Sequence, residues 1–90
     1  MKITAEISLY PLTENYEEVV IDFIQRLKRD SIRMEVNGLS TQLFGDYDEV
    51  MALLQAEAKR LFESQKAVLL MKIAAGDKEL TKEALPDVLK

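Results

Sequence analysis

Ninety residues with 48% hydrophobic and 31% charged side chains suit one small folded domain and lie well outside the range of disordered chains. The 12 basic and 16 acidic side chains give a net charge of −4, so no overall basic field exists to attract a nucleic acid. Cysteine and histidine are absent, which removes disulfides, thiolate nucleophiles and the commonest general base and metal ligand. We expect no cofactor and no metal.

The first strand is predicted over residues 2–10, where apolar side chains from Ile3 to Leu9 alternate with polar ones. Pro11 would end it. This alternation is unlike a signal peptide, and no apolar run approaches the ~20 residues that a bilayer-spanning helix requires. We therefore expect no membrane partner and a cytoplasmic location.

A helix is predicted next, from a capping box formed by Asn15 and Glu18 to about Arg29. Apolar side chains recur at helical spacing along one side of it: Tyr16, Val19, Val20, Phe23, Ile24 and Leu27. We expect this side to lie on the hydrophobic core.

A hairpin is predicted by Asn37-Gly38, two residues that accept positive φ, between a strand over residues 31–36 and a strand that begins at Leu39. If the loop holds only those two residues, three pairs face each other: Val36 with Leu39, Met34 with Thr41, and Ile32 with Leu43. A slip of one residue would exchange the two faces, so every assignment of a side chain to a face depends on this turn.

The second helix is predicted from a cap at Asp46 to about Ser64. Its expected buried stripe consists of Val50, Met51, Leu54, Ala58, Leu61 and Phe62. Residues 66–73 supply a fourth strand. The composition changes after this strand, and we expect a tail over residues 76–90 with one short helix from Thr81 through Leu85.

The predicted element order, β-α-β-β-α-β with two right-handed crossovers, is the split βαβ pattern. It predicts a ferredoxin-like α+β domain over residues 1–75, with a four-stranded antiparallel sheet of order 4-1-3-2 and both helices on one face. The other face must then meet solvent, a ligand or a second subunit. Consecutive apolar residues over 67–71 indicate that both sides of the fourth strand are covered, which favours a second copy of the chain.

Polar side chains occupy the centre of this open face in the predicted register: Thr4, Glu6, Ser8, Ser40 and Gln42, with Lys72 on the fourth strand. Such a surface suits a small ligand held by a few hydrogen bonds, and a cationic ligand would meet Glu6 and Glu35. Alternatively, Glu6 pairs with Lys72 across the sheet and the face is only a wet subunit interface. Residue chemistry alone leaves both interpretations open.

Two stretches of the chain carry a resemblance to a known family. They run from Ala5 to Leu12 (AEISLYPL) and from Asn37 to Met51 (NGLSTQLFGDYDEVM), and they resemble the YkoF-like family of thiamine-binding proteins. The resemblance covers the chain from the first strand to the fourth. It implies a ferredoxin-like domain that forms dimers or tetramers and binds thiamine or hydroxymethylpyrimidine without converting it.

The positions that match the family's strand motifs are Glu6, Ser8, Asn37, Ser40 and Thr41, and the resemblance implies that they bind the ligand. Glu35, which a cationic ligand would also meet on the open face, completes the predicted ligand-binding residues. Either glutamate would balance the charge of a thiazolium ring, and the hydroxyl and amide groups of the other four would bond the edge of an aminopyrimidine. Thr41 falls on the core side of the predicted hairpin. It therefore lines a pocket between sheet and helices, or the hairpin register differs from the prediction.

Three functional hypotheses follow. The leading one is a non-catalytic homo-oligomer that binds thiamine or a related pyrimidine. The second is a structural or regulatory interaction domain whose open face makes subunit contacts only. The third, an enzyme that uses carboxylate and amine groups such as Glu6 and Lys72, would require a closed pocket that tunes the protonation of both groups.

Overall fold

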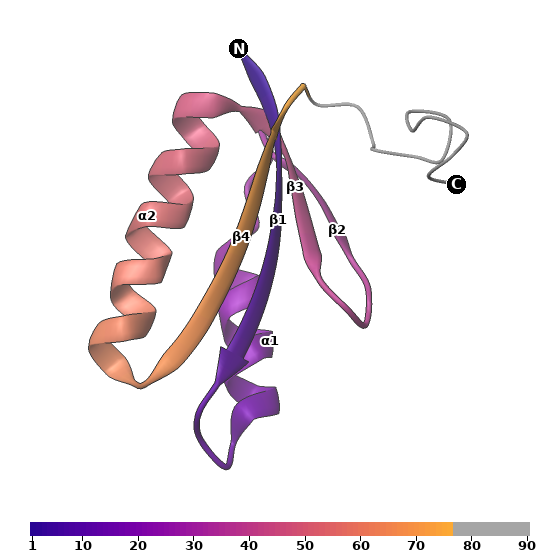
Figure 1. The fold of residues 1–90 in the computed structure, drawn as a ribbon. Helices are drawn as coiled ribbons and strands as arrows, with labels where there is room; N and C mark the ends of the chain where they lie inside the picture. Colours follow the sequence, from indigo (N-terminus) through magenta and orange to yellow (C-terminus); the bar gives the residue numbers. More distant parts are fainter. Residues whose placement is uncertain (77–90) are drawn as a thin grey trace.

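The computed structural model describes residues 1–76, which form four strands and two helices (Figure 1). In chain order these are β1 (Lys2–Pro11), α1 (Tyr16–Arg26), β2 (Arg33–Val36), β3 (Thr41–Asp46), α2 (Tyr47–Ser64) and β4 (Ala67–Ala75). This order confirms the predicted β-α-β-β-α-β succession. The expected tail helix over Thr81–Leu85 lies outside the described residues.

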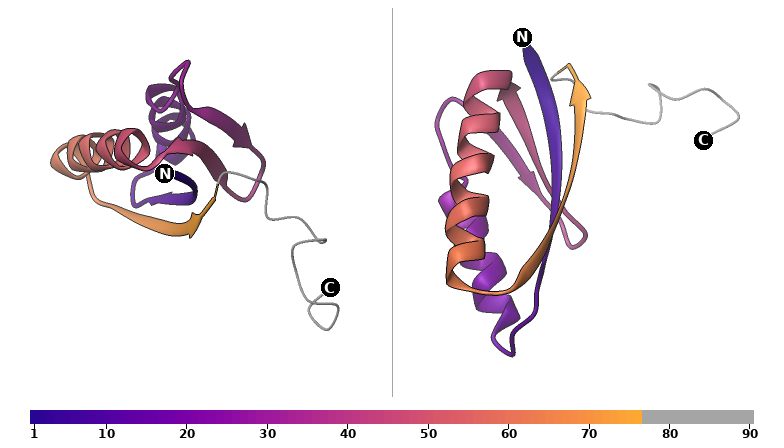
Figure 2. Two further views of the ribbon diagram at one scale, coloured as in Figure 1. Left: turned by 90° about the horizontal axis from the view of Figure 1, so that it is seen from above. Right: turned by 60° about the vertical axis from the view of Figure 1, so that its left-hand side comes forward.

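The strands form one antiparallel sheet in the order β2-β3-β1-β4, which confirms the predicted order. Helices α1 and α2 lie side by side on the same face of this sheet, and no described helix or strand covers the other face (Figure 2). The domain is therefore an α+β fold of the ferredoxin-like type. The sheet twists strongly along its strands, as Figure 2 also shows.

The hairpin between β2 and β3 differs from the prediction in its loop. Val36 pairs with Thr41 and Met34 pairs with Leu43, so the loop runs from Asn37 to Ser40 rather than over two residues. The Asn37 side chain shapes this longer loop, because its Oδ1 accepts hydrogen bonds from the backbone N–H groups of Leu39 (2.8 Å) and Ser40 (3.1 Å). Since the register shift is two residues, the paired side chains of β2 and β3 keep their predicted faces. Leu39, which was predicted to begin the third strand on the core side, instead lies in the loop and is 89% exposed.

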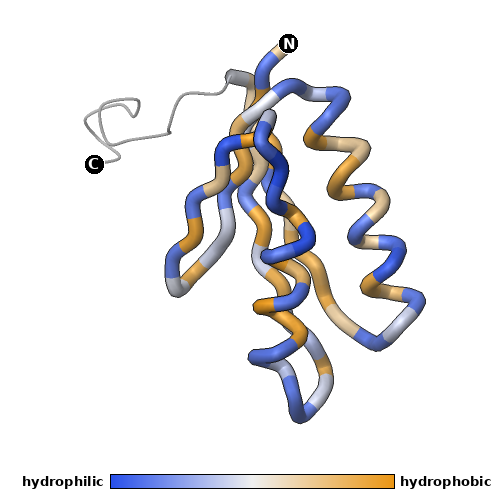
Figure 3. The backbone as a smooth tube through the Cα atoms, turned by 180° about the vertical axis from the view of Figure 1, so that it is seen from behind, coloured by the Kyte–Doolittle hydropathy of each residue, from blue (hydrophilic) through white to orange (hydrophobic). Residues whose placement is uncertain are grey.

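The core lies between the sheet and the two helices. Its buried apolar side chains are Ile3, Ala5, Ile7, Phe23, Leu27, Ile32, Leu43, Val50, Leu53, Leu54 and Leu61. Along β1 they alternate with polar residues, and Figure 3 shows changes of hydropathy along the chain. The sheet therefore has one apolar face and one mostly polar face.

The buried side of α2 was predicted wrongly in part. Phe62 is 51% exposed, whereas Leu53, which was not expected in the core, is 8% exposed. Successive helix residues are ~100° apart, so Leu53 joins Val50, Leu54 and Leu61 on one side while Phe62 falls on the flank. Tyr16, in the first turn of α1, is also exposed, although helical spacing places it on the same side as Phe23 and Leu27. The buried stripe of each helix is therefore smaller than its apolar content suggested.

Neither predicted helix cap forms. The side chains of Asn15 and Asp46 make no capping hydrogen bond. Asn15 lacks the extended backbone conformation that directs a capping oxygen at the next turn, since its φ and ψ are −89° and 40°. The Asp46 carboxylate instead lies 3.4 Å from the amino group of Met1. Helix α1 also ends at Arg26, earlier than the predicted Arg29.

No loop separates β3 from α2: the strand ends at Asp46 and the helix begins at Tyr47. Gly45 makes room for this junction. A β-carbon at position 45 would lie 3.3 Å from Cγ2 of Val50 and 3.4 Å from Cγ1 of Ile32, which is closer than ordinary packing. The absent side chain thus lets the first turn of α2 pack against the end of β3.

Neither helix within residues 1–76 is long and apolar enough to cross a bilayer.

Candidate functional site

One polar side chain from each strand forms a row across the centre of the open face. Glu35 of β2 pairs with Gln42 of β3, Gln42 pairs with Glu6 of β1, and Glu6 pairs with Lys72 of β4. Directly opposed residues of antiparallel strands point to the same face of a sheet. The row therefore gathers two carboxylates, one carboxamide and one ammonium group on a single surface. We call these four residues the polar row.

Glu6 lies at the centre of the interactions on this surface. Its Oε2 accepts a hydrogen bond from Oγ of Ser40 at 3.2 Å, and its Oε1 lies 3.9 Å from Nζ of Lys72. The side chain of Glu6 is 37% exposed and that of Lys72 is 76% exposed. The ion pair that the sequence allowed as an alternative to a ligand contact is therefore present. Because both groups reach solvent, their attraction is weak.

A hollow of about 420 Å³ opens beside the polar row. Its lining residues are Thr4, Glu6, Gln42, Lys72, Ile73 and Ala74. The hydroxyl group of Thr4 donates a hydrogen bond to the carbonyl oxygen of Gly76 at 2.9 Å, which ties the end of β4 to β1 next to the hollow. A volume of this size lies within the range of small-molecule sites. Two charged side chains and one amide side chain thus line a space with the volume of a small organic ligand.

The six residues that the sequence assigned to a ligand fall into two groups. Glu6, Ser8 and Ser40 lie together, since Ser40 bonds to Glu6 and Oγ of Ser8 donates to the carbonyl oxygen of Leu39 in the adjoining loop (3.3 Å). Glu35 lies on the same face at the outer end of the polar row, where its Oε1 is 2.7 Å from Nη1 of Arg33. The structure therefore brings four of the six predicted residues to the open face or its edge.

The other two predicted residues have different surroundings. The Asn37 side chain accepts the two loop hydrogen bonds described above and so supports the hairpin. Thr41 is 5% exposed on the helix-covered face, where it pairs with Ile7 of β1. The sequence left two explanations for Thr41 open: a pocket between sheet and helices, or a hairpin register other than the predicted one. The observed register does differ from the predicted one, but by two residues. Thr41 consequently stays on the face opposite Glu6.

Five residues lining the hollow were not among the predicted ligand residues: Thr4, Gln42, Lys72, Ile73 and Ala74. Gln42 and Lys72 were placed on the open face, and the strand alternation that found Glu6 was sufficient to include both. Ala74 was missed because β4 extends to Ala75 and not only to residue 73. Ile73 was missed because it pairs with Ala5, on the face that strand alternation assigns to the helices. Ala74 pairs with Thr4, and its small side chain leaves space beside the polar row.

An apolar strip borders the polar row on β1 and β4. It consists of Tyr10, Val68 and Leu70, which are 54%, 52% and 51% exposed. Val68 pairs with Tyr10, so the strip lies on the open face. We keep the name apolar strip for these three residues. Exposed large apolar side chains in one strip are typical of surfaces that a partner covers.

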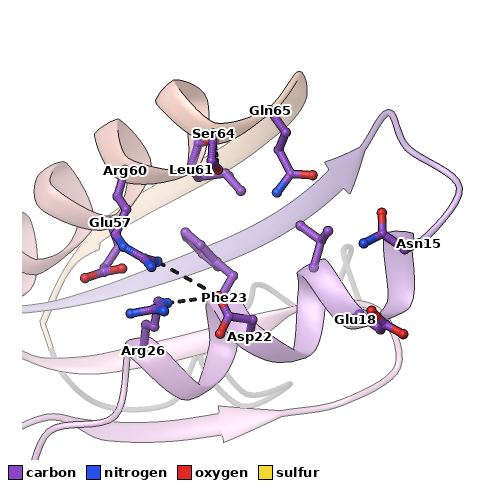
Figure 4. Close-up of a pocket in the computed structure, with 11 residues that line it drawn as sticks. Asn15, Glu18, Asp22, Phe23, Arg26, Glu57, Arg60, Leu61, Ser64 and Gln65 are labelled. Carbon is purple, nitrogen blue, oxygen red and sulfur yellow. Dashed lines mark hydrogen bonds and ion pairs between the residues drawn. The ribbon is translucent and has the colours of Figure 1, made fainter.

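A second hollow of about 260 Å³ lies between α1 and α2, on the helix layer (Figure 4). Its charged groups contact one another: Asp22 Oδ2 lies 2.9 Å from Nε of Arg26 and 3.9 Å from Nη1 of Arg60. Oε1 of Glu57 is buried there without a hydrogen-bond partner among the described residues. The inter-helix hollow thus holds mainly exposed ion pairs that join the two helices. None of the predicted ligand residues lines it.

Within residues 1–76, no group of three or more carboxylate, imidazole or thiol side chains is arranged to hold a metal ion. On the open face, the polar row offers hydrogen-bonding groups and single charges.

The fold defines a small ferredoxin-like α+β protein whose open sheet face is mostly polar. A family model described as thiamine-binding protein matches residues 5–87, almost the whole chain. The chain belongs to this family of thiamine-binding proteins, as the resemblance of its first and third strands implied. The match also extends beyond β4, further along the chain than the stretch on which the resemblance was based.

Three solved structures are similar to this chain. A Thermotoga maritima protein with a provisional assignment to thiamine biosynthesis or salvage is 24% identical, with a TM-score of 0.74 over 93% of this chain and 94% of its own. A Streptococcus pneumoniae protein is 23% identical, with a TM-score of 0.77 over 93% and 96%. A Methanocaldococcus jannaschii protein is 29% identical, with a TM-score of 0.72 over 92% and 90%. These likenesses support the fold. No curated protein sequence matches this chain significantly.

Proposed function

We propose that this protein binds thiamine or its hydroxymethylpyrimidine moiety without converting it, and that it does so as a homo-oligomer. The observation that carries the proposal is the family match over residues 5–87 in a chain whose open face holds a hollow beside Glu6. Thiamine combines a cationic thiazolium ring with an aminopyrimidine that donates and accepts hydrogen bonds. The polar row supplies groups of both kinds.

Each group on the open face has a role in this proposal. Glu6 would accept a hydrogen bond from the pyrimidine amino group or balance the thiazolium charge, as its position in the hollow allows. Gln42 would match a ring nitrogen and an amino group together, since a carboxamide both donates and accepts. Ser8 and Ser40 would add hydroxyl contacts, and Glu35 would act at the outer end of the row. The Asn37 loop would hold Ser40 in place.

Binding without conversion fits these groups. The hollow offers hydrogen-bonding and charged side chains on an open sheet surface, where the carboxylate of Glu6 already contacts Ser40 and Lys72. A few hydrogen bonds and a single charge are sufficient to orient a ring in a binding site. A binding protein of this kind would serve the delivery, salvage or sensing of the vitamin. The provisional assignment of the Thermotoga maritima protein to thiamine biosynthesis or salvage agrees with such a role.

The apolar strip supports the oligomer in this proposal. Tyr10, Val68 and Leu70 each leave about half of their surface in solvent. A second copy that packs its own strip against them, to form a dimer or a tetramer, would remove this area from water and would also close one side of the hollow. A closed hollow would cover more of a bound ligand than a single open sheet can.

Titration calorimetry with thiamine and with hydroxymethylpyrimidine tests the proposal. We expect saturable binding of at least one ligand, and we expect Glu6→Gln to weaken thiamine binding about tenfold because one charge-assisted contact is lost. Glu35→Gln is the matched control at the outer end of the same row, and its effect should be smaller. No heat with either ligand at high micromolar protein would contradict the proposal.

A structural or regulatory interaction domain is the second candidate function. The observation that favours it is the Glu6–Lys72 ion pair next to an exposed apolar strip, because both features are also expected of a wet subunit interface. A crystal structure of the oligomer separates the two functions. Partner side chains that fill the hollow beside Glu6 would favour the interaction domain, whereas a hollow left open within the oligomer would favour a ligand.

A further inference from the structure

The two carboxylates of the polar row already have cations beside them. Glu6 Oε1 lies 3.9 Å from Nζ of Lys72, and Glu35 Oε1 lies 2.7 Å from Nη1 of Arg33. A cationic ligand therefore does not meet two unbalanced negative charges at Glu6 and Glu35. It must compete with a lysine or an arginine of the protein itself.

The two internal cations are held to different degrees. The guanidinium carbon of Arg33 lies 3.8 Å from the centre of the Phe44 ring, so a cation–π contact and a short ion pair fix it together. Lys72 has a longer contact to Glu6 and a side chain that is 76% exposed. An exposed ammonium group at the limit of ion-pair distance leaves its partner at little cost, because water solvates both charges.

Lys72 is also the cation that lies at the hollow. It lines this space together with Glu6, whereas Arg33 does not. Its stem rises from β4 at the position directly opposite Glu6. A positive ligand group that approaches Glu6 from the hollow thus enters the space beside the Lys72 ammonium, and like charges repel at such distances.

We propose that Lys72 is a displaceable counter-ion that competes with the cationic part of the ligand for Glu6, and so sets the selectivity between cationic and neutral ligands. This inference rests on the proposed function, since it places the ligand on the open face. A neutral hydroxymethylpyrimidine accepts or donates hydrogen bonds beside an intact Glu6–Lys72 pair. A thiazolium ring must instead move the Lys72 ammonium into solvent, which lowers the affinity for thiamine.

The test compares thiamine, the cationic ligand, with hydroxymethylpyrimidine, the neutral ligand, by calorimetry on the full chain at fixed ionic strength. Lys72→Met removes the charge and keeps an apolar stem of similar reach. We expect this variant to bind thiamine about threefold tighter and hydroxymethylpyrimidine within twofold of the wild type. Lys72→Gln should act in the same direction, which guards against an effect specific to methionine.

Lys59→Met is the matched control. It removes the same charge from an exposed position on α2, away from the hollow, and it should change neither affinity. A weaker affinity of the Lys72 variants for both ligands would overturn the inference, because Lys72 would then contact the ligand directly. An unchanged ratio of the two affinities would overturn it as well, while the proposed function would stand. Failure of both ligands to bind wild type and variants would overturn both proposals.

Discussion

The two faces of the sheet, built from the same strands, differ in what their side chains do. On β1, Ile3, Ala5 and Ile7 point to the helices and are almost completely buried, while the residues between them point to the open face. Burial on one face supplies the hydrophobic contribution to folding. The other face is thereby released from packing and can carry hydrogen-bonding groups whose arrangement suits a ligand.

The open face is itself divided. At the end where β4 stops, Thr4 and Phe44 are 6% and 4% exposed although no described helix covers them. Arg33 lies over the Phe44 ring and Thr4 bonds to Gly76, so local contacts bury this end. The centre of the face, around Glu6, remains open. Strand alternation therefore identifies a face, whereas the contacts within that face decide which part of it can bind.

The sharpest test of the two faces uses neighbouring residues of β3. Leu43 is 0% exposed on the helix-covered face, and Leu43→Ala should lower the free energy of unfolding by about 2–5 kcal/mol because it leaves a cavity. Gln42→Ala changes the open face one position earlier and should cost less than about 1 kcal/mol. Urea unfolding followed by circular dichroism measures both. Equal losses would show that the open face contributes to stability as the core does.

A smaller effect is expected in the hairpin loop. Asn37→Ala removes the oxygen that accepts hydrogen bonds from the N–H groups of Leu39 and Ser40, and it should cost about 1 kcal/mol. Asn37→Asp keeps the acceptor and is the control, with a loss of less than half that value. Urea unfolding again provides the measurement. A larger loss for the aspartate variant than for alanine would contradict a role of the side-chain oxygen in the loop.

The smallest effect on chain stability is expected in the apolar strip. Leu70→Lys places a charge on a side chain that is 51% exposed, and the free energy of unfolding of a single chain should change by less than about 0.5 kcal/mol. The molar mass from light scattering should nevertheless fall by about half, since a charge would be buried in the proposed contact. Glu63→Lys on α2 is a control outside the strip. An unchanged mass for Leu70→Lys would place the contact elsewhere.

The fold was predictable because its main signals are local. Alternation over residues 2–10 and the two amphipathic stretches depend only on neighbouring residues, and they placed β1, α1 and α2 correctly in kind and order. The hairpin loop was predicted with two residues and has four, yet Glu6, Ser8 and Ser40 still share the open face. An even shift preserves the side of every residue, so this error left the predicted face intact.

The features that the sequence did not predict depend on contacts between distant residues. The exposure of Phe62 follows from how α2 is rotated over the sheet, which periodicity alone does not determine. The absent caps at Asn15 and Asp46 reflect backbone angles and an interaction with Met1. The sequence left open whether Glu6 contacts Lys72 or a ligand, because the Glu6–Lys72 contact depends on the pairing of β1 with β4. These features can be read only from the tertiary structure.

The direct passage from β3 into α2 limits how this region can evolve. With Asp46 as the last strand residue and Tyr47 as the first helix residue, strand register and helix rotation cannot vary independently. One inserted residue at this point would turn the helix by ~100° and move Val50 and Leu54 off the sheet. We therefore expect homologues to vary in length at the Asn37–Ser40 loop, in steps of two residues, and to keep this junction unchanged.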